Sequence, residues 1–150
     1  MSFVVLGHFM LLDSSKGQTG DQVTLLSPKL ALSVRSLLKF SFQMLLNDTD
    51  TDGTLTVYRY TQLHVYDAVL FQVRGNRGVK WLSQEICLRT GEYQLAFVGT
   101  IGLASLSDIA IDNIKVTKGQ DCDEQDSSPS EGLAICVLIM MTTILIINNE

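Results

Sequence analysis

The sequence predicts an all-β protein, folded as an antiparallel β-sandwich or jelly roll. Short segments of alternating or apolar residues follow one another closely along the chain. Glycine, proline, asparagine or aspartate bounds each of them, and helical periodicity is absent between residues 1 and 116. Short strands at this spacing are typical of two stacked antiparallel sheets.

The strands can be placed in order along the chain. The first covers residues 3–12 around Gly7, and the others cover residues 54–60, 68–73, 79–87, 93–98 and 109–116. Between the first two, a further strand places one apolar row on a single face and a mixed row on the opposite face. The apolar row is Leu38, Phe40, Phe42 and Met44, and the mixed row is Leu37, Lys39, Ser41 and Gln43.

The alternation of the last strand breaks in its middle. Ile109 and Ile111 share one face, whereas Ile114 and Val116 are out of phase with them by one residue. The slip falls at Asp112 and its neighbour, so we expect a β-bulge that restores the inward face and directs the carboxylate at a specific partner.

Size and charge limit the functional classes. The chain of 150 residues fits one domain, and its net charge is −5. Lysine and arginine are scattered without a basic stripe, so nucleic-acid binding is not expected. His8 and His64 stand alone, and no hydrolase, metalloprotease or phosphate-loop motif occurs. The sequence predicts no catalytic site.

Several residues are candidates for other roles. Asn47 begins an Asn-Asp-Thr glycosylation sequon. Residues 48–53 match the first half of a calcium loop, but the twelfth position is Arg59, which favours a hairpin tip instead. Trp81, the sole tryptophan, is predicted to anchor the core, with an exposed sugar-stacking platform as the alternative.

The C-terminal part differs in character from the rest. Residues 119–131 are acidic and rich in hydroxyl side chains, so we expect a flexible stalk. Residues 132–147 are almost continuously apolar and predict a short helix. A membrane-spanning helix needs about 20 such residues, and a lipid-anchor attachment signal ends in a similar apolar run. Both alternatives stay open.

With these segments in order, residues 7–122 resemble the MAM domain, an extracellular adhesion module named for meprin, the A5 antigen (neuropilin) and receptor phosphatase mu. The matching pieces begin with residues 7–15 (Gly-His-Phe-Met-Leu-Leu-Asp-Ser-Ser) and 25–28 (Leu-Leu-Ser-Pro). They continue with residues 38–44, 53–57, Trp81, 93–97 and 108–114 (Asp-Ile-Ala-Ile-Asp-Asn-Ile), followed by Gly119 and Cys122.

The resemblance implies a jelly-roll β-sandwich over residues 1–118, an extracellular location and a role in adhesion. The family has a cysteine-bearing segment ahead of the Gly7 region that is missing here, so the domain is expected to be partial. The family's cysteine partner for the C-terminal cysteine is replaced by Leu37. The resemblance therefore predicts that Cys122 is free or makes an intermolecular bridge.

The resemblance also suggests a cation site. Some members hold a cation with acidic side chains near the last strand, and the matching positions here are Asp112, Asp13 and Asp21. The implied ion is a structural calcium or sodium.

Together these features predict a non-catalytic module at the extracellular face of the cell membrane. It would bind another protein, or a second copy of itself through an open sheet edge. Two alternatives remain: an accessory interaction domain of an ectoenzyme or receptor, and a carbohydrate-binding jelly roll.

Overall fold

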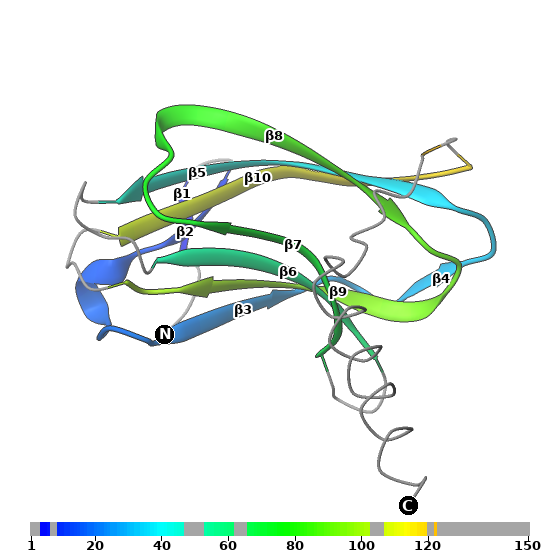
Figure 1. The fold of residues 1–150 in the computed structure, drawn as a ribbon, viewed down its shortest axis with the longest axis horizontal. Helices are drawn as coiled ribbons and strands as arrows, with labels where there is room; N and C mark the ends of the chain where they lie inside the picture. Colours follow the sequence, from blue (N-terminus) through cyan, green and yellow to red (C-terminus); the bar gives the residue numbers. More distant parts are fainter. Residues whose placement is uncertain are drawn as a thin grey trace, which may run out of the picture.

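The computed structural model describes residues 4–6, 9–46, 53–61, 66–102, 107–119 and 122. Their strands form two antiparallel sheets that lie face to face (Figure 1). Sheet A has the order β1-β2-β10-β5-β8. Its strands are β1 (Val4–Leu6), β2 (Phe9–Leu12), β5 (Ser36–Leu46), β8 (Gly78–Leu88) and β10 (Ser107–Lys118).

Sheet B has the order β3-β9-β6-β7, and β4 also pairs with β9. Its strands are β3 (Gln22–Leu26), β4 (Leu30–Leu32), β6 (Thr54–Tyr60), β7 (Tyr66–Arg74) and β9 (Gly91–Thr100). The predicted all-β antiparallel sandwich is confirmed. The first predicted strand is in fact a pair, β1 and β2, which fold back on each other.

The core lies between the sheets, and the inward-facing side chains of the strands fill it. On β5 the apolar row from Leu38 to Met44 is buried, as predicted. The Phe40 ring packs edge-on against Phe97 of sheet B, with 5.3 Å between centroids, and against Phe71 at 5.7 Å. Phenylalanines from both sheets therefore hold the two layers together.

The predicted bulge lies in β10. The pairing of β10 with β5 shifts between Asp112 and Lys115, and Asn113 has a positive φ of 55°. Ile109 and Ile111 are buried, and Ile114 packs against the same core. The extra residue thus returns the second half of the strand to the inward face.

Among the described residues the helical element is η1 (Ser14–Lys16), a single 3-10 turn. The described residues thus contain no helix that is long and apolar enough to cross a membrane. The predicted stalk and terminal apolar helix lie outside the described residues, apart from Gly119 and Cys122.

Candidate interaction surface

Three tyrosines gather on the outer side of sheet B. On β6, Leu55 and Val57 belong to the core, so Tyr58 and Tyr60 point outward. Tyr58 pairs with Val69 of β7, and Tyr60 pairs with Tyr66. We call the surface formed by Tyr58, Tyr60, Tyr66 and Val69 the tyrosine face.

The rings of Tyr58 and Tyr60 both contact the ring of Tyr66 at tilted angles. Tyr66 lies 4.6 Å from Tyr58 and 5.5 Å from Tyr60, measured between ring centroids. Tyr66 is nevertheless 46% exposed and Val69 is 58% exposed. Aromatic side chains with a polar tip are enriched in protein interfaces, because they combine apolar area with a hydrogen-bonding group.

Polar groups adjoin this face at the end of β6. A hollow of about 360 Å³ is lined by Tyr60, Lys29, Glu92 and Gln94, among others. The Gln94 amide donates to the carbonyl of Ser27 at 2.6 Å. The tyrosine face is therefore bordered by amide and charged side chains, as the polar rim of an interface requires.

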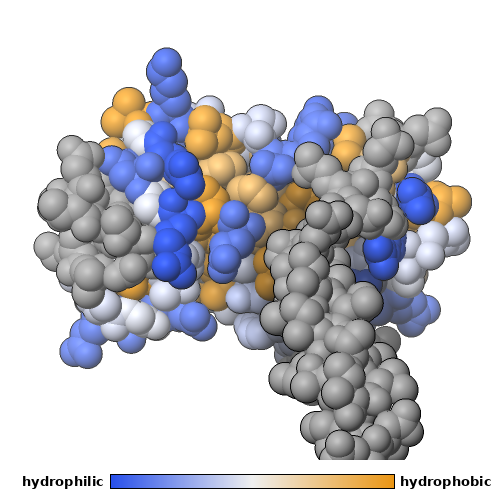
Figure 2. Space-filling view, viewed as in Figure 1, coloured by the Kyte–Doolittle hydropathy of each residue, from blue (hydrophilic) through white to orange (hydrophobic). Residues whose placement is uncertain are grey.

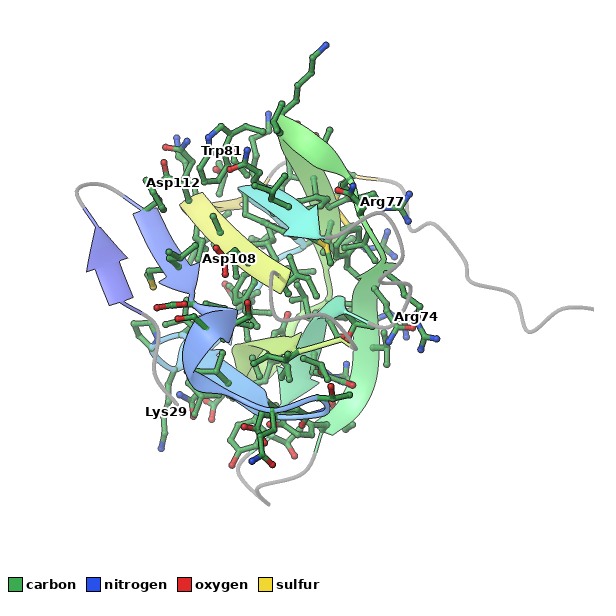
Figure 3. The ribbon with its side chains drawn as sticks, turned by 90° about the vertical axis from the view of Figure 1, so that its left-hand side faces the viewer. Lys29, Arg74, Arg77, Trp81, Asp108 and Asp112 are labelled. Atoms are coloured by element: carbon green, nitrogen blue, oxygen red, sulfur yellow. A yellow bond between two sulfur atoms is a disulfide. The ribbon has the colours of Figure 1, made fainter. Side chains whose placement is uncertain are left out.

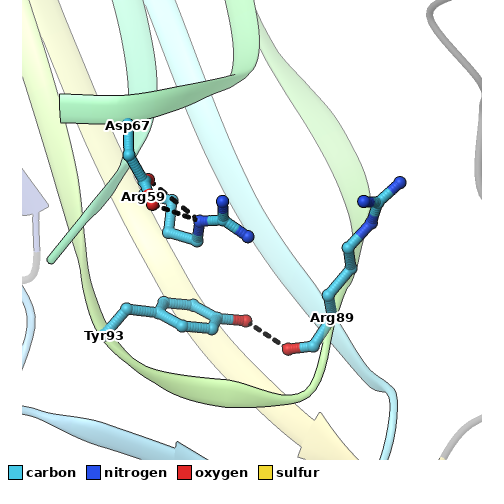
Figure 4. A network of polar contacts seen from close by, with 4 residues as sticks. All are labelled: Arg59, Asp67, Arg89 and Tyr93. Carbon is cyan, nitrogen blue, oxygen red and sulfur yellow. Dashed lines mark hydrogen bonds and ion pairs between the residues drawn. The ribbon is translucent and has the colours of Figure 1, made fainter.

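An ion pair closes one end of the sandwich (Figure 4). Arg59 lies on the inward side of β6, and its Nε donates to both carboxylate oxygens of Asp67, at 2.9 and 3.0 Å. The hydrogen bond from Arg59 to Asp67 raises the pKa of Arg59. The guanidinium lies 5.9 Å from the centre of the Tyr93 ring, and the Tyr93 hydroxyl donates to the carbonyl of Arg89 at 2.6 Å.

A groove of about 1100 Å³ runs between β7 and β8. Its lining includes Leu70 and Phe71 from β7, Ile86 and Leu88 from β8, and Arg59. Figure 2 shows apolar surface in the middle of this side of the molecule, with hydrophilic side chains on either side. Consecutive strands belong here to different sheets, and the space between them exposes part of the core.

The prediction that Cys122 is free or intermolecular is wrong, because Cys122 forms a disulfide with Cys87. After β10 the chain turns at Gly119, whose N–H donates to the carbonyl of Arg35 at the start of β5. Cys122 thereby reaches β8, where Cys87 lies directly opposite Leu37. Cys87 of the neighbouring strand thus takes the place of the cysteine that Leu37 replaces, as bonding partner of Cys122. The sequence does not indicate this, because it depends on the pairing of β8 with β5.

The prediction that Trp81 anchors the core is also wrong. Trp81 is 43% exposed and lies on the outer side of sheet A (Figure 3). Its ring meets Phe9 edge-on at 5.7 Å. The aromatic role in the core belongs to phenylalanines of β5, β7 and β9, and β8 contributes Leu88 to the core instead.

The carboxylates predicted to hold a cation serve local backbone groups instead. Asp13 accepts from the N–H of Ser15 at 3.0 Å, and Asp21 accepts from the N–H of Gln18 at 2.9 Å. Asp112 accepts from the N–H of its neighbour Asn113 at 2.7 Å, inside the bulge. In the described part of the chain, no group of three histidine, cysteine or acidic residues could hold a metal ion. The cation site at Asp13, Asp21 and Asp112 therefore stays a prediction.

Sequence reasoning missed the role of Asp108. Its carboxylate accepts from the N–H of Ser14 at 3.1 Å and from the Ser14 hydroxyl at 3.2 Å. This contact ties η1 to β10, and Figure 3 labels Asp108 on that strand. The pairing spans most of the chain, so nothing local in the sequence indicates it. Asn47, His8 and His64 lie outside the described residues.

Comparison with known families gives a match over most of the chain. The family model of the MAM domain, meprin/A5/mu, matches residues 4–123. MAM domain-containing protein 2 of Mus musculus is 31% identical over 137 residues, which cover 85% of this chain and 19% of that protein. Neuropilin-1 of Xenopus laevis is 30% identical over 112 residues, which cover 72% of this chain and 12% of that protein.

The chain therefore spans less than a fifth of the length of these relatives. Among solved structures, the K1 cleaved adhesin domain of Lys-gingipain from Porphyromonas gingivalis W83 superposes with a TM-score of 0.59. The superposition covers 75% of both chains at 16% sequence identity. At this identity the likeness concerns the two-sheet fold alone.

Proposed function

Because this chain belongs to the MAM domain family, meprin/A5/mu, we propose that it is an extracellular module that binds another protein through its tyrosine face. MAM domains are non-catalytic and mediate protein interactions. The jelly-roll connectivity and the adhesion role that the family resemblance implies are part of this proposal.

The exposure of the tyrosine face carries the proposal. Tyr66 and Val69 lie on the edge strand β7 and offer apolar area to solvent. Tilted contacts with the rings of Tyr58 and Tyr60 restrict the movement of the Tyr66 ring. An aromatic side chain that is held in place loses little conformational entropy on binding, which favours affinity.

Two features support an extracellular location. The Cys87–Cys122 disulfide is of the kind that persists in oxidising compartments, and Asn47 begins a sequon that is glycosylated only in chains that enter the secretory pathway. Attachment to the membrane through residues 132–147 remains part of the proposal. If the chain is secreted by mammalian cells, glycosidase treatment should lower its mass, and the Asn47→Gln variant should show no such change.

The test compares two exposed aromatic residues on opposite sheets. The purified chain is screened against a panel of cell-surface ectodomains that includes the chain itself. Tyr66→Ala should weaken any binding by about tenfold or more, as truncation of an interface aromatic does. Trp81→Ala removes a side chain of similar exposure from sheet A and should leave binding unchanged. Equal loss in both variants, or in neither, would contradict the proposal.

A second function is favoured by one observation, the exposure of Trp81. An exposed indole beside Phe9 could stack on a sugar ring, which makes carbohydrate binding the alternative function. A glycan array distinguishes the two. If the chain binds carbohydrate, a glycan on the array should bind the unmodified chain and the Tyr66→Ala variant, and should not bind the Trp81→Ala variant.

The relatives are much longer than this chain, so the proposal extends to the case in which this domain is one part of a longer protein. As an accessory domain of an ectoenzyme or receptor, the chain would supply contacts to a partner while other domains supply the activity. The isolated chain should then bind the partner of the longer protein and show no turnover of its own.

A further inference from the structure

The two strands that border the groove are both edge strands. β7 ends the order of sheet B and β8 ends the order of sheet A, and neither has a second strand partner among the described residues. An edge strand presents unpaired N–H and C=O groups, which can pair with another extended chain. Here two such edges face the same groove.

The two edges differ in regularity. The pairing of β7 with β6 shifts twice, between Val57 and Tyr58 and between Arg59 and Tyr60. Such irregularities disrupt an edge as a template. β8, in contrast, pairs with β5 without interruption over residues 82–88. This stretch is long enough for an added strand of about 20 Å.

A side chain already covers one backbone group of the β8 edge. The Gln84 amide donates to the carbonyl of Glu85 at 2.9 Å. The N–H and C=O of one strand residue point to the same side in an antiparallel ladder. The Glu85 backbone therefore faces the groove, and its carbonyl is satisfied by a side chain that can move away.

The groove beside this edge suits a polypeptide better than a small molecule. Its volume of about 1100 Å³ exceeds the roughly 300–1,000 Å³ of small-molecule pockets. A strand added to β8 would extend sheet A over β7. Its inward side chains would then contact Leu70 and Phe71, which now border the groove.

One end of the groove is cationic. Arg59 and Arg89 both line it, and Asp67 binds the Nε of Arg59. Figure 4 shows the terminal nitrogens of Arg59 turned away from Asp67. A carboxylate at this end of a bound segment would complement the guanidinium group.

From these features, and resting on the proposed function in protein binding, we propose that β8 binds an extended segment of a partner protein by β-strand addition. The segment carries apolar residues at alternate positions and an acidic residue near Arg59. Main-chain hydrogen bonds to the β8 edge supply affinity, and the apolar floor supplies selectivity.

The test uses the full chain and a phage-displayed library of random 12-residue peptides. Enriched peptides should alternate apolar and polar residues and lack proline in the bound stretch. Glu85→Pro removes one of the N–H groups that face the groove, and should weaken the binding of these peptides by about tenfold. Glu85→Ala keeps that N–H and loses the same ion pair with Lys39, so it should bind as the unmodified chain does.

Amide hydrogen exchange on the unmodified chain provides a check that does not depend on folding of the proline variant. A bound peptide should slow exchange at Glu85 and leave the amides of β3 unchanged. The inference fails if no peptide is enriched, if Glu85→Pro binds as well as Glu85→Ala, or if Glu85 exchange is unaffected. It also fails if sedimentation shows that a second copy of the chain occupies this edge. Failure here leaves the ectodomain screen with Tyr66→Ala as a separate test of the proposed function.

Discussion

Tyr93 is the residue at which burial has a direct consequence for pH dependence. Burial raises the pKa of Tyr93, and the nearby Arg59 cation lowers it by a smaller amount. The neutral phenol is therefore favoured in the folded state. Its contribution to stability is fully present below pH of about 10, the value for an unfolded tyrosine. That contribution is lost as the pH rises through the higher pKa of the folded state.

Chemical denaturation at a series of pH values measures this effect. The free energy of unfolding should decline above pH of about 10, and less steeply in Tyr93→Phe than in the unmodified chain. Near pH 7, Tyr93→Phe should cost about 1 kcal/mol, because the hydrogen bond to the Arg89 carbonyl is lost. An unchanged slope in Tyr93→Phe would contradict the burial effect.

Gly99 is required by close packing between the sheets. A Cβ at this position would lie 2.6 Å from Cδ2 of Leu12, which is fully buried. We expect Gly99→Ala to lower the free energy of unfolding by about 1–3 kcal/mol, as overpacking does. In a Leu12→Ala background the same substitution should cost less, because the clashing atom is gone. Additive costs in the double variant would show that the contact is not responsible.

At the scale of the element, the bulge in β10 can be tested by its backbone conformation. Asn113 has a φ of 55°, which glycine and asparagine tolerate and β-branched residues do not. Asn113→Ile should lower the free energy of unfolding by about 1–3 kcal/mol, whereas Asn113→Gly should be nearly neutral. Thermal or urea unfolding of the two variants gives the comparison, and similar costs for both would argue against a conformational requirement.

The strands were predictable because alternation is a local property. The buried row of β5 and the phase slip of β10 could both be identified from residue order alone, since each side chain faces the core or solvent with a period of two. The purpose of the slip was predicted less well. Asp112 was expected to meet a specific partner, which the sequence did not identify, and it accepts from the N–H of Asn113 within the bulge.

Trp81 was expected inside, but it points to the outer side of sheet A, whereas Leu88 of the same strand is buried. The cysteine prediction failed because it depended on the order of strands within the sheets. Cys87 and Leu37 are adjacent only because β8 pairs with β5. The tyrosine face joins β6 and β7 in the same way. Local sequence patterns do not contain these pairings, so the candidate site could not be assembled from the sequence.

At the scale of the whole molecule, the Cys87–Cys122 disulfide joins the end of the last strand to the edge of sheet A. Its two cysteines are separated by 35 residues, and a loop of that size predicts a stabilisation of about 4 kcal/mol from the reduced entropy of the unfolded chain. Cys87→Ser and Cys122→Ser should each lower the free energy of unfolding by a similar amount.

The double variant decides whether the two cysteines act together. If they form one intrachain bond, Cys87→Ser/Cys122→Ser should be no less stable than either single variant, since the bond can be lost only once. Costs that add would point to two separate roles. Peptide mapping without reduction should recover Cys87 and Cys122 in one linked fragment from monomeric protein. Because the bond holds Cys122 against the β7–β8 groove, its loss should also change peptide binding at β8, which neither Gly99→Ala nor Asn113→Gly should do.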